Sequence, residues 1–303
     1  DELVTTEHYD LVVADEAWDV DYFLHENPER KRFEFAWLTD FVGWLPMPDG
    51  GDREAYVAAD YNAEMIEQRA RHRRLRDRSI FVGEPDDIVP DSFGPGLPGI
   101  REWTEENFEF AGYVTGFDPA DVADKQALRD ELGYRPDEPV CIVTVGGSGV
   151  GIDMLRRVLD SLPVVRRLVD DLRVVVVCGP RLDPRALPRR KGVSYRRYVP
   201  DLHRHLAACD LAVVQGGLTT CMELTASRTP FVYVPLRHHF EQNFHVHHRL
   251  QRHRAGRRLD YEEAADREAL AKVIADEVGR PVDYLAVTGE GAARAATSIA
   301  ALI

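Results

Sequence analysis

Two glycine-rich turns in the second half of the chain have the composition of phosphate-binding loops. The first reads GGSGVG at residues 146–151 and follows the apolar run 140–145, and the second reads GGLTT at 216–220 and follows the apolar run 211–214. Glycine lets the backbone approach a ligand closely, and the free N–H groups at the start of a following helix favour an anion. Because both apolar runs are typical of buried parallel strands, we expect the turns at the carboxyl edge of a sheet, where ligands bind in open α/β folds.

The order of elements around the second turn indicates a parallel α/β fold. Residues 211–245 predict a strand, a glycine turn, a helix, a second strand at 231–234, a loop and another helix beginning at Glu241. This alternation is typical of a parallel sheet with crossover helices, and it brings two helix N-termini to the carboxyl edge. The spacing Thr220-x-x-Glu223 also has the form of a capping box, which needs no ligand, so a purely structural role for both residues stays open.

The same stretch resembles the donor-site motif of glycosyltransferases of the GT-B fold, an α/β fold with two Rossmann-like domains that face each other across a cleft. GGLTTCME followed by FVYVPLRHHFEQNFH is similar to the lipid II-forming N-acetylglucosaminyltransferases and the galactolipid synthases, and more distantly to the UDP-glycosyltransferases. In that family the glycine turn and the hydroxyls after it bind the diphosphate, a Glu in the next helix binds the ribose, and an acid–Gln or Gln–Gln pair binds the sugar. The resemblance thus implies Gly216, Gly217, Thr219, Thr220, Glu223, Glu241 and Gln242 as donor-binding residues.

Further donor contacts follow from the resemblance, which covers most of residues 138–260. The family has a glycine-rich loop near the pyrophosphate at the place of GGSGVG, and it holds the base with the loop that reads YVPDL here, although a plain packing loop is the alternative. Plant members carry His before the second glycine turn, where this chain has Gln. These further implied contacts are Gly146, Gly147, Ser148, Gly149, Tyr198, Val199 and Gln215.

Sugar transfer also needs a base that deprotonates the acceptor hydroxyl. Small-molecule relatives use a His that is oriented by an Asp at a strand end. VVADEAW at residues 12–18 resembles the strand that bears this Asp, which implies Asp15, while the His would belong to a segment before the first residue given. An acid at a strand end is also a common helix cap, and this alternative stays open.

Other motifs carry weaker chemistry. Counted from Gly147, the fingerprint GxGxxG would require glycine at Ile152, and the strand ending near Cys178 carries no acid for a ribose, which argues against a dinucleotide cofactor. Asp19-Val20-Asp21 has the form of a metal-binding DxD, but acids are expected at a helix start in any case. Six histidines lie at 238–253 without HExxH or a nearby Cys, so we interpret them as a polar helix beside an anionic donor, not as a zinc site.

Composition limits the class of protein. The net charge of −14 argues against a nucleic-acid-binding protein, although basic residues gather at 69–78 and 249–258, which we interpret as solvated helix faces. The four cysteines form no CxxC pair and indicate a reducing compartment. No apolar run approaches about 18 residues, which predicts no transmembrane segment. We therefore expect a cytoplasmic protein, with a peripheral position at a membrane as the alternative.

The 303 residues suffice for two domains. We expect an acceptor-side domain at 1–121, a nucleotide-sugar-binding domain at 122–285, and a C-terminal helix at 286–303 that packs back across both. The sequence starts at what is predicted to be an interior strand near Tyr9, so only the second half of the acceptor-side domain is expected.

The sequence predicts an inverting, metal-independent glycosyltransferase that uses a nucleotide diphosphate sugar, with a UDP-sugar as first choice, and needs no cofactor. Helix N-termini can stabilise the leaving diphosphate without a metal. The acceptor stays open between a lipid, a glycan and a small molecule. Two alternatives remain at this point: a UDP-sugar epimerase of the same fold, and a non-catalytic nucleotide-sugar-binding protein.

Overall fold

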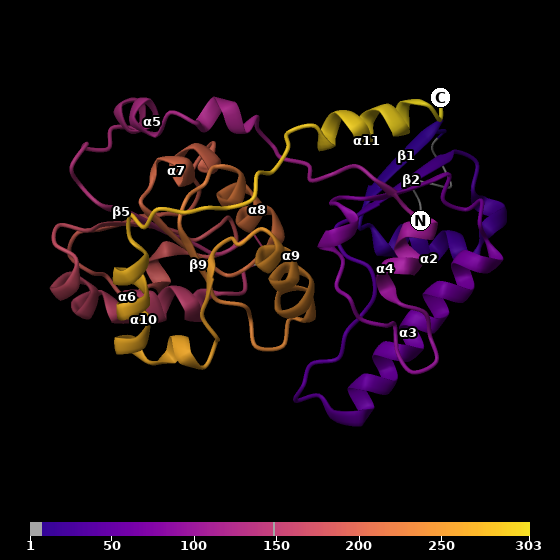
Figure 1. Ribbon diagram of the computed structural model, residues 1–303, viewed down its shortest axis with the longest axis horizontal. Coiled ribbons are helices and arrows are strands. Elements are labelled where there is room, and N and C mark those ends of the chain that lie inside the picture. The colour runs from indigo at the N-terminus through magenta and orange to yellow at the C-terminus, as the bar shows by residue number, and fades with distance from the viewer. Residues whose placement is uncertain (1–7, 148) are drawn as a thin grey trace. The chain divides into compact units, whose positions relative to one another are not determined.

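The computed structural model describes residues 8–147 and 149–303, which form two compact units (Figure 1). Unit 1 consists of the residues up to 114 together with 288–303, and unit 2 consists of 115–287. Each unit is built on a parallel sheet of its own, as the predicted α/β class requires. No helix in the described part of the chain is long and apolar enough to cross a membrane.

Among the described residues, the sheet of unit 2 has six parallel strands in the order β10-β9-β8-β5-β6-β7. β5 and β8 are neighbours, and Thr144 lies opposite Val214 in their register. The two glycine turns follow these two strands, so they leave the sheet side by side at its carboxyl edge. The strands are β5 (Val140–Thr144), β6 (Arg173–Val177), β7 (Val193–Arg196), β8 (Leu211–Val214), β9 (Phe231–Tyr233) and β10 (Arg257–Arg258).

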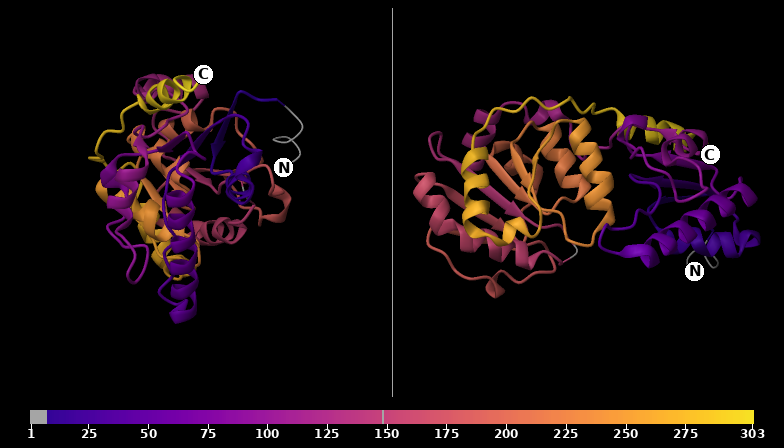
Figure 2. Two further views of the ribbon diagram at one scale, coloured as in Figure 1. Left: turned by 90° about the vertical axis from the view of Figure 1, so that its right-hand side faces the viewer. Right: turned by 60° about the horizontal axis from the view of Figure 1, so that its bottom comes forward.

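Helices flank this sheet on both sides (Figure 2). α6 (Ile152–Leu168) packs against α10 (Arg267–Glu277), and the core between them and the sheet includes Leu155, Leu159 and Ile274. Apolar residues recur every three or four positions in α6, so one face of this helix is buried. Each fully buried Leu or Ile contributes about 1.5–3 kcal/mol to folding, which holds the start of α6 firmly at the end of β5. The other helices of unit 2 are α5 (Lys125–Leu132), α7 (Leu202–Ala208), α8 (Leu218–Ala226) and α9 (His247–Arg252), and a π-helix spans Glu241–Val246.

In unit 1 the part of the chain that the structure describes forms four parallel strands in the order β1-β2-β3-β4. Helix α11 closes this unit from the C-terminal end of the sequence, because Ala295 and Ile299 pack on Ile80 and Ala111. The strands are β1 (Leu11–Asp15), β2 (Glu34–Thr39), β3 (Arg78–Phe81) and β4 (Glu109–Phe110), and the helices are α2 (Trp18–Glu26), α3 (Gly51–Arg71), α4 (Ile100–Asn107) and α11 (Gly291–Ala300).

The long polar helix of unit 1 is shorter than its sequence predicts. The basic residues at 69–78 were interpreted as a solvated helix face, but α3 ends at Arg71. Past this point the chain turns inward, and Arg76 donates two hydrogen bonds to the buried Asp21, at 2.7 and 2.5 Å. This buried ion pair holds the segment that leads into β3. The chain therefore leaves the helix at Arg71 in spite of the helix propensity of the residues that follow.

Candidate functional site

The two glycine turns of unit 2 touch each other through one side chain. Gly151 caps α6 with φ +117°, a conformation that residues with a side chain rarely adopt. A Cβ at this position would lie 2.5 Å from Oε1 of Gln215 and 2.8 Å from Cγ1 of Val145. The side chain of Gln215, from the second turn, therefore lies against the first residues of α6, and only glycine leaves it room.

Gln215 has a buried hydrogen-bond donor that no described residue accepts. The residue is 5% exposed. Its Nε2 is buried and has no hydrogen-bond partner among the residues that the structure describes. Such an unsatisfied group costs about 1–3 kcal/mol, so a bound acceptor would recover free energy at this point. The N–H groups that start α6 lie beside it, and together they form a cluster of donors suited to an anion.

The space in front of the two helices is open. A Cβ built on Gly146, Gly147 or Gly217 would meet nothing within 4 Å, and all three residues are exposed. Gly216 is buried and has φ +94°, which turns the chain from β8 towards α8. The backbone of both turns is thus free to contact a ligand closely. Ser148, which the resemblance implies as a donor contact, lies outside the described residues.

The capping-box interpretation of the second turn is wrong. α8 begins at Leu218, its N-cap is Gly217, and no side chain caps the helix. Thr220 is therefore the third residue inside the helix and not its N-cap, because the chain enters the helical conformation directly after the glycine pair. Glu223 lies one turn further on and does not reach back to an N-cap N–H.

Glu223 is a half-buried carboxyl group without a counterion. No hydrogen bond or ion pair joins its side chain to the described residues, and burial raises the pKa of the Glu223 carboxyl above its ordinary value. A carboxyl in this position is stabilised by any hydroxyl or N–H that a ligand brings to it. With the capping role removed, the ligand contact that the resemblance implies stays a prediction for Glu223.

Glu241 and Gln242 open a π-helix, a rare conformation that is frequent at functional sites. Gln242 is buried, and its Oε1 accepts a hydrogen bond from the backbone N–H of Leu236 at 2.9 Å. Asn243 donates to the carbonyl of Leu236 at 2.8 Å and to that of His239 at 2.9 Å. These bonds fold the loop after β9 onto the start of the π-helix and fix the position of the pair.

Tyr198 and Val199 lie apart from the glycine turns. They follow β7, which β6 separates from β5, so they are roughly 10 Å from the first turn across the sheet. Tyr198 is 69% exposed. Both residues border a pocket of about 260 Å³ whose floor includes Tyr134 and His205, joined by a hydrogen bond of 2.8 Å.

A family model matches this half of the chain. The model describes the glycosyltransferase family 28 C-terminal domain, and it aligns with residues 140–302, more than half of the sequence. The chain belongs to glycosyltransferase family 28. The matched region contains both glycine turns, Glu223 and the pair at Glu241, so the family resemblance expected from these residues is confirmed.

Two curated relatives and one solved structure place the chain more closely. An uncharacterized glycosyltransferase of Methanopyrus kandleri is 27% identical over 70% of this chain and 59% of its own length. The UDP-N-acetylglucosamine–N-acetylmuramyl-(pentapeptide) pyrophosphoryl-undecaprenol N-acetylglucosamine transferase of Thermobifida fusca is 30% identical over 52% of this chain and 38% of its own length. A spinosyn rhamnosyltransferase in complex with thymidine diphosphate has a TM-score of 0.56 at 18% identity, covering 97% of this chain and 69% of that one.

The structural similarity shows the fold, and the curated relatives are matched over only part of their length. At 18% identity the structural likeness shows the fold alone, and the GT-B fold expected from the sequence is confirmed. The chain spans between about two fifths and three fifths of the length of the two curated relatives.

The DxD motif of this family 28 chain is not arranged to hold a metal. Asp19 is exposed, whereas both carboxylate oxygens of Asp21 accept hydrogen bonds from Arg76. Burial alone would raise the pKa of Asp21, but the hydrogen bonds and charge of Arg76 outweigh it and hold the pKa at about 2. Among the described residues no cluster of three or more His, Cys, Asp or Glu side chains could hold a metal ion. Asp15, the last residue of β1, is exposed and has no side-chain partner in the described part of the chain.

Sequence reasoning missed one cation beside the first turn. After β6 the chain bends at Gly179, where a Cβ would lie 2.9 Å from the carbonyl oxygen of Gly146. This close contact places Arg181 next to the first glycine turn, because its Cβ lies 3.1 Å from where a Cβ on Gly149 would be. The side chain is exposed and forms no ion pair with a described residue. A lone Arg after a strand carries no motif, so only the structure reveals it.

Sequence reasoning also missed a tyrosine–histidine pair next to the second turn. Tyr233 ends β9, and its hydroxyl lies 2.7 Å from Nδ1 of His247. A Cβ on Gly216 would lie 3.6 Å from the ring of Tyr233, so this pair supports the turn from below. Burial lowers the pKa of His247, which favours the neutral imidazole next to the phenol.

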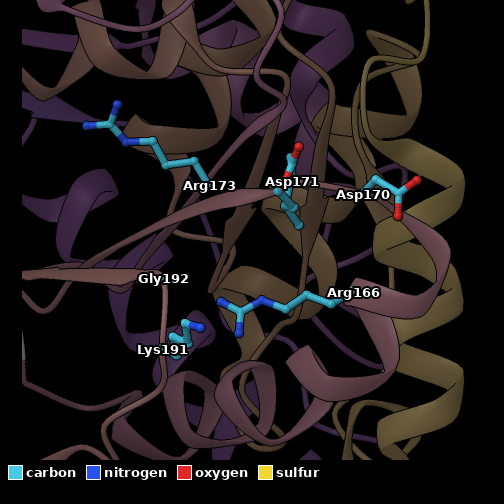
Figure 3. Close-up of a pocket in the computed structure, with 7 residues that line it drawn as sticks. Arg166, Asp170, Asp171, Arg173, Lys191 and Gly192 are labelled. Atoms are coloured by element: carbon cyan, nitrogen blue, oxygen red, sulfur yellow. The ribbon is translucent and has the colours of Figure 1, made fainter.

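A pocket of about 830 Å³ lies at the opposite, amino edge of the same sheet (Figure 3). Arg173 begins β6, and Lys191 and Gly192 precede β7. In Figure 3 the side chains of Arg173 and Asp170 point apart and do not converge on one point. The donor-site motifs of the family lie at the carboxyl edge, so this pocket is not part of the candidate site.

Proposed function

We propose that this family 28 chain transfers a sugar from a nucleotide diphosphate donor, with uracil as the base of first choice, to an acceptor hydroxyl, with inversion and without a metal ion. The observation that supports this best is the buried, unpartnered Nε2 of Gln215 beside the N-terminus of α6. It is a donor that a diphosphate oxygen would satisfy. The relative from Thermobifida fusca is named for a UDP-sugar donor, and the spinosyn enzyme was solved with a nucleoside diphosphate.

In this proposal unit 2 stabilises the leaving group. The acceptor oxygen attacks the anomeric carbon, the bond from that carbon to the diphosphate breaks, and its electron pair leaves with the diphosphate. The negative charge that develops is stabilised by the N-termini of α6 and α8, by Gln215 and by the nearby cation Arg181. A metal ion is not required for this role, so transfer is expected to persist in EDTA.

The remaining contacts of the donor follow along the same edge. The carboxylate of Glu223 accepts hydrogen bonds from the ribose hydroxyls, and Glu241 with Gln242 binds hydroxyls of the sugar. The loop at Tyr198 and Val199 holds the base, at the distance from the glycine turns that an extended nucleotide requires. The acceptor stays open between a lipid, a glycan and a small molecule.

Replacing Gln215 tests the proposal directly. Gln215→Met keeps the length of the side chain and removes its N–H, so the affinity for UDP should fall by about tenfold or more in titration calorimetry, whereas binding of uridine should not change. The melting temperature should stay constant or rise, because Met leaves no unsatisfied donor in the free protein. Gln126→Met is the matched control, since Gln126 is exposed on α5 and bonds only to Asp130. Equal UDP affinity in wild type and Gln215→Met would contradict the assigned diphosphate contact.

The two alternatives, a UDP-sugar epimerase and a non-catalytic binding protein, differ from a transferase in the products they form. A UDP-sugar incubated with the protein alone should remain unchanged or release UDP slowly, and UDP release should accelerate when a total lipid extract or another acceptor mixture is added. Conversion to a different UDP-sugar without any acceptor would indicate the epimerase. Tight binding of UDP without turnover in any mixture would indicate a binding protein.

A further inference from the structure

We propose that Glu16, at the carboxyl edge of the sheet of unit 1, is the base that takes the proton from the acceptor hydroxyl. The inference rests on the sugar transfer proposed above. Glu16 follows β1 directly and has φ +52°, in the left-handed region that a residue with a side chain seldom adopts. Residues in such strained conformations cluster at functional sites, and they persist only where the surrounding structure holds them.

The backbone around Glu16 supplies that support. Its N–H donates to the carbonyl of Leu38 at 3.1 Å, which extends the pairing of β1 with β2 by one residue. Its own carbonyl accepts from the N–H of Trp18 at 2.8 Å, at the start of α2. The residue is thus fixed from both sides, and its side chain leaves the strand in a direction that an extended residue would not give it.

The carboxylate itself is anchored through one oxygen only. Oε1 accepts a hydrogen bond from the hydroxyl of Thr39 at 2.8 Å and another from the N–H of Asp40 at 3.1 Å. No described residue donates to Oε2, and the residue is half-buried. One oxygen therefore positions the group while the other stays available for a proton, which is the arrangement a general base needs.

The surroundings adjust the proton affinity of Glu16 in the required direction. Burial raises the pKa of Glu16, the hydrogen bonds from Asp40 and Thr39 oppose this, and the neighbouring charge of Asp15 raises it further. The charge that acts on it is that of another acid, Asp15, the last residue of β1. A carboxylate with a raised pKa is a better proton acceptor than an ordinary one.

Aromatic rings next to Glu16 suit an acceptor with an apolar or ring-shaped face. The ring of Trp18 lies 4.8 Å from that of Trp37, 5.5 Å from that of Trp44 and 6.1 Å from that of Phe41, measured between centroids. Trp37 and Phe41 are buried, whereas Trp18 and Trp44 are half-buried, so the rings of Trp18 and Trp44 are the ones on which a sugar or a hydrocarbon can pack. Asp15, which the family resemblance suggested, is exposed and has no comparable anchoring.

The step balances without any further reactant. The acceptor O–H bond breaks, its proton binds Oε2 of Glu16, and its oxygen forms the new bond to the anomeric carbon. The bond from that carbon to the diphosphate breaks at the same time, and the diphosphate keeps the electron pair. The protonated Glu16 then returns its proton to solvent.

Glu16→Gln separates this role from a structural one. The amide oxygen of Gln can accept the hydrogen bonds from Thr39 and Asp40, so the melting temperature and the affinity for UDP should match the wild type. The rate of UDP release from UDP-N-acetylglucosamine, UDP-glucose or UDP-galactose, with a total lipid extract as acceptor mixture, should fall by about 10²–10⁴-fold. Glu26→Gln, on an exposed site of α2, should keep the wild-type rate. A rate for Glu16→Gln within threefold of the wild type would overturn the proposal.

The pH dependence gives a second readout. In the wild type the rate should rise as Glu16 loses its proton, with a midpoint above the ordinary pKa of Glu, and Glu16→Gln should lack this rise. If the wild type binds UDP and turns over no donor in any mixture, the proposed transfer fails first. In that case carbon-13 NMR of labelled glutamate carboxyls tests Glu16 by itself. The resonance that is missing from the spectrum of Glu16→Gln belongs to Glu16, and it should titrate with a pKa above the ordinary range of Glu. An ordinary midpoint would overturn the assignment.

Discussion

The two parallel sheets end in different chemistry at their carboxyl edges. In unit 2, β5, β6 and β8 are followed by turns that contain Gly146, Gly179 and Gly216. In unit 1, β1 is followed by Glu16 and β2 by Asp40. Bare backbone at a helix start attracts an anion, whereas carboxylates repel a diphosphate and accept hydrogen bonds from hydroxyls. The same sheet architecture thus provides one edge suited to a charged leaving group and another suited to a neutral nucleophile.

The substitution with the largest expected effect on the carboxyl edge of unit 2 is Gly151→Ala. The new Cβ would meet Gln215 and Val145 in a backbone conformation that Ala avoids, so we expect a loss of about 2–4 kcal/mol in the free energy of unfolding. The affinity for UDP should fall at least about a hundredfold, because the start of α6 must move. Gly133→Ala is the control, since Gly133 also has a positive φ but nothing within 4 Å of the new Cβ. It should cost about 1–2 kcal/mol and leave UDP binding unchanged in calorimetry.

Glu223 sharpens the comparison, since it is a carboxylate on the edge that is proposed to bind the anion. As a ribose ligand it should contribute about 1.5–3 kcal/mol, so Glu223→Ala should weaken UDP by at least about tenfold while the melting temperature changes little. The UDP affinity of Glu223→Gln should lie between that of the wild type and that of Glu223→Ala. Binding of inorganic pyrophosphate should be the same in all three proteins, because it has no ribose. A lowered melting temperature with unchanged UDP affinity would make Glu223 a structural residue.

The smallest expected effect is that of the cation beside the first turn. Arg181→Ala should weaken UDP by about fivefold, or roughly 1 kcal/mol, and the difference should shrink at high salt because the side chain is exposed. Arg185→Ala is the matched control, since Arg185 lies four residues further on and is paired with Asp183. If both variants bind UDP equally well at low salt, Arg181 has no part in the site.

Local patterns in the sequence were enough for the sheet of unit 2 and the position of its turns. Runs such as RVVVV can only be buried strands, and a glycine pair after such a run marks its end. The family motif then predicted which edge carries the site. The two glycine turns lie side by side because β5 and β8 are neighbours in the sheet.

What the sequence could not provide are contacts between residues far apart in the chain. Thr220-x-x-Glu223 has the spacing of a capping box, yet the helix begins three residues earlier and Gly217 is its N-cap. Asp21 belongs to a motif that can bind metal, but its partner Arg76 lies in the segment before β3. The same holds for Glu16, whose left-handed backbone and bonds to β2 leave no trace in the local sequence.

Unit 1 is discontinuous, and this has a consequence for how the protein is made. Ile80 and Ala111 are covered by Ala295 and Ile299 of α11, and the carbonyl of Tyr113 lies so close to Gly291 that only glycine fits there. A ribosome therefore synthesises all of unit 2 before it releases the residues of α11. During that interval the apolar surface beneath α11 stays uncovered, so the nascent first unit would depend on chaperones for longer than the second.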